Sequence, residues 1–315
     1  MMKKSKYIYN ILTIGYGSMG RRHIRNLMAL FGDKVVIDIL RRKEIKAIES
    51  SDTDTRMRFL FSDIELRDHY DAVFITNPTS LHYETLKKYQ PLSDAFFIEK
   101  PVFVTGDEDI SSLLDTEKKY YVACPLRYSN VIQWLKNNMD FNTVHSMRVI
   151  SSSYLPDWRP GTDYRETYSA HRDMGGGVSI DLIHEWDYIS YLIGFPQRVQ
   201  SIIGKRSNLE IDSDDVALYI AEYEDKVAEV HLDYFGRKPI RRMELFTSDD
   251  TIVADLIGQR ITWLCSGKEL ALSEDRDSYQ RKELQHFLDI IDGDICSDNG
   301  IEEACRVLRI ARGVK

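Results

Sequence analysis

The sequence contains few cysteines, no long apolar segment and no excess of positive charge. Its four cysteines, Cys124, Cys265, Cys296 and Cys305, share no metal-ligand spacing, so we expect reduced thiols and no metal site. No apolar run approaches the roughly 20 residues that span a bilayer, and the basic N-terminus lacks a small-residue cleavage site. The net charge of −8 argues against nucleic acid as the main partner. These absences predict a cytoplasmic protein without a membrane or nucleic-acid partner.

The chain is long enough for two domains. Its 315 residues exceed the roughly 250–300 that one hydrophobic core organises, and 43% of them are hydrophobic. Strands and helices alternate over residues 1–125, which predicts an α/β, doubly wound Rossmann domain. Residues 126–315 carry several alternating strand patterns, which predict an α+β substrate-binding and oligomerisation domain on a mainly antiparallel open sheet.

A glycine-rich turn follows the first predicted strand, Tyr7–Ile14, and precedes a predicted helix and a second strand, Lys34–Leu40. Glycines at such a turn let backbone amides and the helix N-terminus approach a pyrophosphate. This context favours a dinucleotide site over a plain glycine turn. The predicted phosphate-binding residues are Gly15, Gly17, Ser18, Met19 and Gly20.

The residues after the second strand bear on the choice of cofactor. NAD sites usually place an acid there, but Leu40 is followed by Arg41 and Arg42. An arginine can pair with a 2′-phosphate, so the sequence slightly favours NADP over NAD. In the alternative, both arginines are solvated and Asp38 binds the ribose.

Several motifs together resemble the Gfo/Idh/MocA family, named for glucose–fructose oxidoreductase, inositol dehydrogenase and MocA. The motifs are GYGSMG at 15–20, TNPTSLH at 76–82, EKP at 99–101, LRY at 126–128, GGG at 175–177 and the Asp181…His184 segment. The resemblance implies a Rossmann domain followed by an open antiparallel sheet that covers the nicotinamide and often forms the oligomer interface. It also places Asn77, Pro78, His82 and Glu99 at the cofactor.

By the same resemblance, Lys100 is the catalytic lysine and also lies at the cofactor. Asp181 corresponds to an acidic residue that the family carries on a helix of the second half. Family members commonly carry the motif D-x-G-x-H, with histidine four residues after the acid. Here His184 comes at three and Glu185 at four, so the histidine role stays open between them. As a general acid–base, Lys100 needs surroundings that favour its neutral form. Its structural alternative is an exposed lysine beside a turn.

One helix is expected from Val178 to Ile193. It would carry Asp181, His184, Glu185 and Tyr188 on one face, as a solvated stripe or as the wall of an active site. The triple glycine before it favours the wall, because glycines permit close approach of the backbone to a ligand.

The segment of residues 154–172 is rich in tryptophan, tyrosine and arginine and could stack a sugar ring and bind a phosphate or carboxylate. A subunit contact is the alternative, because these residue types are also enriched at interfaces. The predicted substrate-binding residues are Arg127, Trp158, Arg159, Tyr164, Arg165 and Tyr188. The W-R-P…D-Y-R stretch of this segment resembles the corresponding stretch of family members associated with bacterial surface-sugar biosynthesis.

The sequence therefore predicts an NAD(P)-dependent oxidoreductase that acts on a secondary alcohol of a sugar, sugar acid or nucleotide sugar, as a homodimer or homotetramer through the second-domain sheet. Two alternatives remain. One is a redox-neutral lyase or epimerase that cycles bound NAD, and the other is a non-catalytic NADP-binding regulatory protein.

Overall fold

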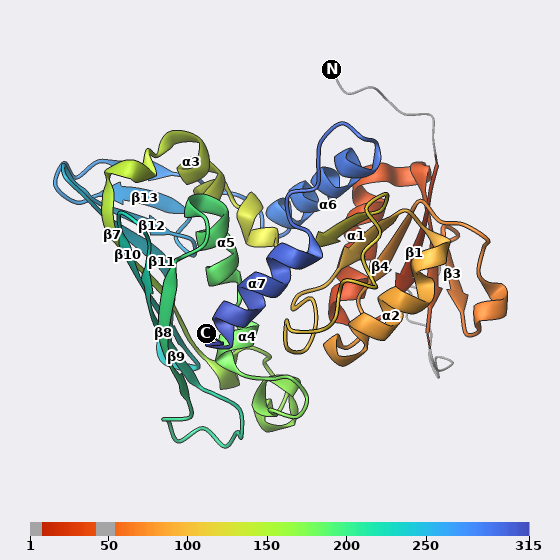
Figure 1. Ribbon diagram of the computed structural model, residues 1–315, viewed down its shortest axis with the longest axis horizontal. Coiled ribbons are helices and arrows are strands. Elements are labelled where there is room, and N and C mark those ends of the chain that lie inside the picture. The colour runs from red at the N-terminus through yellow and green to blue at the C-terminus, as the bar shows by residue number, and fades with distance from the viewer. Residues whose placement is uncertain (1–7, 42–53, 315) are drawn as a thin grey trace. The chain divides into compact units, whose positions relative to one another are not determined.

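The computed structural model describes residues 8–41 and 54–314 and divides into two compact units (Figure 1). The first unit comprises the chain up to Ala123 together with Gln280–Ala304. The second comprises Cys124–Tyr279 together with the residues from Cys305 onward. The sequence boundary at residue 125 had left residues 280–304 with the second half. The structure places them in the first unit, because Phe287 packs against Phe74 and Phe97.

The first unit contains a six-stranded parallel sheet in the order β3-β2-β1-β4-β5-β6. This is the doubly wound Rossmann order, and it confirms the predicted α/β fold. All residues of the two strands β4 and β5 are buried, as expected for central parallel strands covered on both faces. The strands are β1 (Tyr9–Ile14), β2 (Val35–Leu40), β3 (Met57–Leu60), β4 (Ala72–Ile75), β5 (Ala95–Ile98) and β6 (Lys119–Val122).

In the described part of the first unit, the helices over this sheet are α1 (Ser18–Phe31), α2 (His82–Tyr89) and α6 (Ser278–Ile291). His23 of α1 and Phe287 of α6 both contact Phe74 and Phe97, so α1 and α6 share one face. Helix α2 lies over the opposite face (Figure 1). Both faces of the sheet are therefore shielded from water, and its loops remain available at the strand ends.

The second unit contains an eight-stranded sheet in the order β14-β13-β12-β11-β7-β10-β9-β8. Only β7 and β10 pair in parallel, so the predicted, mainly antiparallel sheet is confirmed. The sequence patterns did not indicate β8, β12 or β14. The strands are β7 (Val144–Tyr154), β8 (Arg198–Gly204), β9 (Val216–Glu222), β10 (Val227–Asp233), β11 (Phe235–Thr247), β12 (Thr251–Asp255), β13 (Arg260–Trp263) and β14 (Glu269–Ala271).

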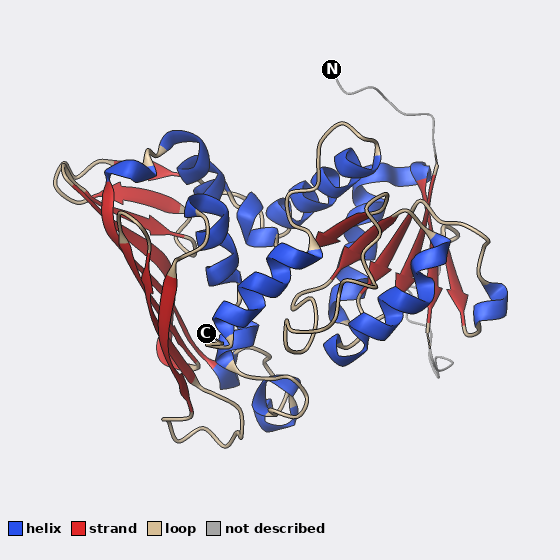
Figure 2. Ribbon diagram, viewed as in Figure 1, coloured by secondary structure: helices blue, strands red, loops and turns tan. Residues whose placement is uncertain are grey.

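The helices of the second unit lie along one face of this sheet (Figure 2). Trp134 of α3 packs on Trp263, Trp186 of α5 packs on Tyr219, and the Tyr219 hydroxyl donates to a carbonyl of α7. These helices are α3 (Asn130–Asn138), α4 (Val178–Asp181), α5 (His184–Ile193) and α7 (Ile301–Ala311), which continues from the first unit.

The single helix expected over residues 178–193 is wrong. The structure has the short helix α4 and a separate helix α5, because Leu182 leaves helical geometry with φ −97° and ψ 30°. The stripe from Asp181 to Tyr188 is therefore broken between its first two members. Asp181 and Glu185 have different neighbours as a result.

Two further findings concern residues 8–41 and 54–314. No helix in them combines the length and apolar character needed to cross a bilayer. No three histidine, cysteine, aspartate or glutamate side chains in these ranges are grouped to hold a metal ion.

Candidate functional site

The glycine loop joins β1 to α1 and leaves the N-terminus of α1 uncapped. Gly15 has φ +101°, and a Cβ there would lie 2.7 Å from the Asn77 nitrogen. A Cβ on Gly20 would lie 2.7 Å from the Gly15 oxygen. Around Gly17, by contrast, no described atom lies within 4 Å of such a Cβ, and no side chain caps the helix. The amides of Ser18 and Met19 therefore begin a helix that can bind an anion.

Asp38 lies within β2, and its carboxylate is fully engaged inside the first unit. It accepts two hydrogen bonds from Arg58, one from Arg67 and one from Tyr70 at 2.5–3.0 Å. Although burial opposes it, these hydrogen bonds hold the pKa of Asp38 below its usual value. Three of these donors converge on Oδ2 and one reaches Oδ1, and Asp38 is 1% exposed. Its carboxylate is therefore used inside the first unit, and burial argues against the alternative role at a ribose.

Arg41 follows β2 directly and lies over the ring of Tyr16, 5.4 Å from its centroid. Arg21 lies over the same ring at 4.7 Å. Among the described residues, the buried Nη1 of Arg41 has no hydrogen-bond partner. Arg42 lies outside the described residues.

The turn after β4 is held by His82, which is buried. Its ring nitrogens lie 2.9 Å from the Asn77 oxygen and 3.1 Å from the Val102 oxygen. Burial lowers the pKa of His82, and the nearby carbonyl groups oppose this. His82 thus connects the Asn77-Pro78 turn to the segment that follows Lys100.

Lys100 follows β5 at the carboxyl edge of the parallel sheet, and Glu99 anchors its backbone. The Lys100 amide donates to Glu99 Oε2 at 3.2 Å. The other carboxylate oxygen of Glu99 makes a short contact with Nε2 of the buried His23 of α1. Burial opposes ionisation of Glu99, but His23 keeps the pKa of that carboxyl below its usual range. Glu99 and His23 therefore hold the start of the loop that carries Lys100 in place.

Asp181 ends α4 and receives a phenol on each carboxylate oxygen. Tyr168 donates to Oδ1 and Tyr234 donates to Oδ2, both at 2.6 Å. Burial, and then the charge of Asp181, raise the pKa of both tyrosines. The phenols therefore remain protonated donors at neutral pH. The arrangement fixes the direction of the Asp181 carboxylate.

Glu185 and Tyr188 lie inside the second unit, against the sheet. Glu185 is fully buried and pairs with Arg241 of β11, whose Nε lies 2.7 Å from its Oε1. Tyr188 is fully buried beside them. His184 is the half-buried first residue of α5. Neither Glu185 nor Tyr188 is on a surface that a substrate reaches.

Arg127 is also an internal residue. It is 1% exposed, and its Nε and Nη2 donate to the Asp187 carboxylate at 2.7–3.0 Å. This fork-shaped pair ties the turn before α3 to α5. The guanidinium that the sequence suggested for a substrate is thus already paired with a carboxylate.

The aromatic segment after β7 divides into internal and exposed residues. The Trp158 indole donates to Ser153 at 2.9 Å and packs edge-on against Tyr234. Arg159 lies over the ring of Tyr168. Arg165 is exposed and paired with Asp163 and Glu210. The hydroxyl of Tyr164 accepts from the Glu210 amide.

The expectation that the triple glycine approaches a ligand is wrong for Gly176 and Gly177. A Cβ on Gly176 would lie 2.0 Å from the Tyr168 oxygen, and one on Gly177 would lie 2.2 Å from Asp214 Oδ1. These glycines instead let the protein's own chain pack closely. The segment that carries Tyr168 is thereby brought against α4, and Tyr168 reaches Asp181 at the end of that helix.

Sequence reasoning missed His23, Tyr168, Tyr234 and Arg241, each of which contacts a predicted site residue. His23 could have been suspected, since a histidine three residues past the glycine loop lies on the sheet-facing side of α1. The partners Tyr168 and Tyr234 are 66 residues apart in the chain, and no local pattern connects them to Asp181.

Comparison with known proteins supports the fold and the glycine loop. Residues 9–128 match the family model described as "Oxidoreductase family, NAD-binding Rossmann fold", GFO_IDH_MocA. These residues resemble the NAD-binding domain of the Gfo/Idh/MocA oxidoreductase family. Among curated proteins, the "Uncharacterized oxidoreductase YrbE" of Bacillus subtilis (strain 168) is 26% identical over 190 residues, 58% of this chain. That match spans about half of the relative, 52% of its length.

Solved structures of dehydrogenases share the whole two-unit fold. UDP-N-acetylglucosamine 3-dehydrogenase GnnA from Acidithiobacillus ferrooxidans superposes with a TM-score of 0.78 at 20% identity, covering 97% of this chain and 96% of the other. Levoglucosan dehydrogenase, in complex with NADH and L-sorbose, gives 0.81 at 16%, covering 97% and 95%. At these identities the likeness establishes the fold alone.

Proposed function

We propose that this protein is an NAD(P)-dependent dehydrogenase that oxidises a secondary alcohol of a sugar or nucleotide sugar, or catalyses the reverse reduction. The observation that carries the proposal lies within the first unit. The uncapped glycine loop follows β1 and Lys100 follows β5, so both lie at the carboxyl edge of one parallel sheet. Ligands of doubly wound sheets bind at that edge.

The residues present fit a dinucleotide. The amides of Gly17, Ser18 and Met19 would hold its pyrophosphate at the N-terminus of α1, where the space beside Gly17 is open. The turn at Asn77 and Pro78, fixed by His82, would border the cofactor. When bound, the nicotinamide ring accepts or donates the hydride of the reaction.

The remaining catalytic roles would fall to side chains of this protein. In the direction of oxidation, Lys100 accepts the proton of the substrate hydroxyl as the carbon loses its hydride. Asp181 accepts a hydrogen bond from a substrate hydroxyl and orients it, because Tyr168 and Tyr234 hold the carboxylate in place. The buried pair of Glu185 and Arg241 makes Glu185 a poor candidate for a proton relay. His184 is the better candidate of the two.

The choice between NADP and NAD rests on Arg41. Its Nη1 lacks a described partner and would bind a 2′-phosphate, whereas the carboxylate of Asp38 is buried and paired with Arg58, Arg67 and Tyr70. The solved relative levoglucosan dehydrogenase is named with NADH, so relatives give this preference no support.

The names of the two solved relatives support a sugar substrate, one of them a nucleotide sugar. The second sheet supports self-association. Strand alternation places Ile202, Ile220 and Val227 on the face without helices, and they are 60%, 56% and 47% exposed. Covering these residues with a second copy would remove apolar surface from water.

The experiment is a turnover assay with Lys100→Met. Reduced nicotinamide is followed by its absorbance while candidate sugars and UDP-sugars are supplied. We expect turnover to fall by roughly two to three orders of magnitude, as for loss of a positioned acid–base group. NAD(P) binding by calorimetry should persist, because the glycine loop holds the phosphates. Normal turnover of the variant would refute the role of Lys100. Product formation without net reduction would instead indicate the redox-neutral reaction.

A further inference from the structure

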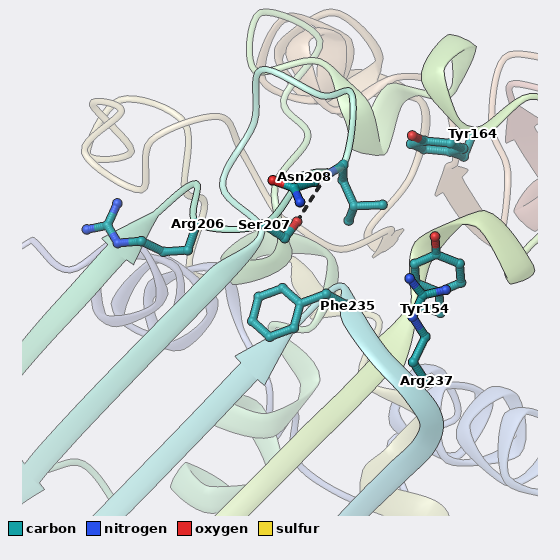
Figure 3. A pocket seen from close by; sticks show the side chains of 8 residues that line it. Tyr154, Tyr164, Arg206, Ser207, Asn208, Phe235 and Arg237 are labelled. Atoms are coloured by element: carbon teal, nitrogen blue, oxygen red, sulfur yellow. Dashed lines mark hydrogen bonds between the residues drawn. The ribbon is translucent and has the colours of Figure 1, made fainter.

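The connection between β8 and β9, residues 205–215, has two parts. Its first part, which includes Ser207, lines a cavity of about 460 Å³ in the second unit (Figure 3). Its second part, residues 212–215, runs inside the unit, where Ser213 and Asp215 are fully buried. The Ser207 hydroxyl donates to the Asp215 carboxylate at 2.5 Å and joins the two parts. The second part therefore makes internal contacts.

Asp214 holds the start of α4, the helix that ends at Asp181. The Val178 amide donates to the Asp214 backbone oxygen, and the Ser179 amide donates to the Asp214 carboxylate, both at 2.9 Å. Gly177, the residue before the helix, has no side chain with which to cap it. Asp214 thus supplies acceptors for helix amides that have no partner within the helix. The position of α4, and with it that of Asp181, depends on Asp214.

The same part of the connection holds the two segments that carry the phenols on this carboxylate. On one side, the Ser213 hydroxyl donates to the backbone oxygen of Ser169, which follows Tyr168, at 2.7 Å. On the other side, the Tyr234 amide donates to the backbone oxygen of Asp215 at 3.0 Å. Three segments that are distant in sequence are therefore bound to one another through four consecutive residues.

Asp214 and Asp181 also interact through their charges. Burial raises the pKa of the Asp214 carboxyl, hydrogen bonds from Ser179 oppose this rise, and the negative charge of Asp181 adds to it. A change at Asp214 can therefore act on Asp181 through the helix or through the charge. An asparagine at this position separates the two, because it keeps an oxygen acceptor and removes the charge.

We propose that Asp214 is a positioning residue for Asp181 and acts through the start of α4. By the same proposal, residues 212–215 align Tyr168 and Tyr234 with that carboxylate. This role rests on the proposed function, in which Asp181 orients a substrate hydroxyl. A displacement of about 1 Å can lower turnover about a hundredfold, so a hydrogen bond remote from the substrate can control the rate.

The test combines kinetics with nuclear magnetic resonance of the full chain carrying isotope-labelled tyrosine. The Cζ resonances report hydrogen bonding of each phenol, and Tyr168→Phe and Tyr234→Phe assign the two that matter. Asp214→Ala should move both resonances and lower kcat roughly tenfold to a hundredfold. The KM for NAD(P) should not change, because the glycine loop belongs to the first unit. Asp214→Asn should restore both resonances and most of the turnover, since it can still accept from Ser179.

The matched control is Asp255→Ala, at the end of β12. The Asp255 carboxylate accepts from the amides of Ile257 and Gly258 at 3.1 and 2.8 Å, and a Cβ on Gly258 would lie 2.3 Å from its Oδ2. Strands β11 and β7 separate β12 from β10, which Tyr234 follows. Asp255→Ala should therefore lower stability while leaving kcat and both resonances as in wild type.

Ser213→Ala is a milder variant, and it carries the test if Asp214→Ala does not fold. It removes only the hydroxyl that donates to the Ser169 oxygen. We expect kcat to fall roughly twofold to tenfold, as for one lost hydrogen bond. The Tyr168 resonance should move more than the Tyr234 resonance, because Ser169 follows Tyr168 in the chain.

The outcomes separate this role from the proposed function. Unmoved resonances in Asp214→Ala and Ser213→Ala, or resonances moved equally by Asp255→Ala, would overturn the positioning role alone. An Asp214→Asn variant that loses as much turnover as Asp214→Ala would overturn alignment through the hydrogen bond and assign the effect to charge. Resonances that move as expected in a protein inactive on sugars and UDP-sugars would support the alignment and overturn the proposed function alone.

Discussion

Glu185 and Arg241 form a buried ion pair between α5 and β11, with Nε of Arg241 2.7 Å from Oε1 of Glu185. Glu185 is fully buried, whereas the Arg241 side chain is 24% exposed. Burial raises the pKa of Glu185, and the positive charge of Arg241 opposes that rise. The pair therefore links α5 to the second sheet. This packing role accounts for the acid at position 185, for which the sequence had suggested catalysis.

Glu185→Gln should lower stability more than activity. The change leaves the Arg241 charge without its anion, which should reduce the free energy of unfolding by roughly 1–3 kcal/mol. Thermal unfolding measures this, and kcat of the folded fraction should stay close to that of wild type. The control is Glu229→Gln, which breaks the exposed pair with Arg148 and should cost less than about 1 kcal/mol. A large loss of kcat without loss of stability would return Glu185 to the catalytic set.

Tyr168→Phe should lower kcat without unfolding the protein. Loss of its hydrogen bond to Asp181 should reduce kcat/KM by roughly tenfold to a hundredfold. In an Asp181→Asn background, the same change should have little further effect, because the two residues act as a unit. Tyr83→Phe, which removes a hydroxyl that donates to the Asp109 carbonyl in the first unit, is the control for kcat. Additive losses in the double variant would show that Tyr168 does not act through Asp181.

His82 should make stability depend on pH on the acid side of neutrality. Burial lowers its pKa in the folded protein below the value of about 6.5 in the unfolded chain. Its contribution is therefore present above about pH 6.5 and is lost as the pH falls toward the lowered pKa. The slope for one proton is at most about 1.4 kcal/mol per pH unit.

The free energy of unfolding, measured between pH 5 and 8, tests this dependence, because histidine titrates in roughly that range. His82→Gln should flatten the acid limb, although it also lowers stability at every pH. His69→Gln changes an exposed histidine of the same unit and should leave the limb as it is. An unchanged slope in His82→Gln would assign the acid dependence to other groups.

Arg41→Gln should weaken NADP binding roughly tenfold to a hundredfold and leave NAD binding nearly unchanged, because only NADP carries the 2′-phosphate. Calorimetry with both cofactors measures the difference. The matched variant Arg21→Gln, on the other side of the Tyr16 ring, separates phosphate contact from ring packing. Wild-type protein that binds NAD more tightly than NADP would contradict the assignment.

The strand patterns of the first half were sufficient to predict its fold. Runs such as residues 72–75 and 95–98 are apolar throughout, and the glycine loop marks the first crossover. The segment of residues 280–304 was misplaced, since its apolar spacing identifies a helix without identifying the sheet on which Phe287 packs.

Residue types and local spacing by themselves indicated the two kinds of sheet and the glycine loop, because these depend on neighbours close in the chain. Lys100 and Asp181 were singled out by the resemblance to a family. Tertiary structure alone decided which polar residues are internal. Arg127 and Tyr188 were predicted to bind the substrate and Glu185 to take part in catalysis, yet each is buried within the second unit, and Arg127 and Glu185 are in ion pairs. Tyr168 and Tyr234 carry no local signal and meet at Asp181 only when distant segments fold together. Hydrogen-bond partners that are far apart in sequence are fixed by packing, and packing has no short-range pattern.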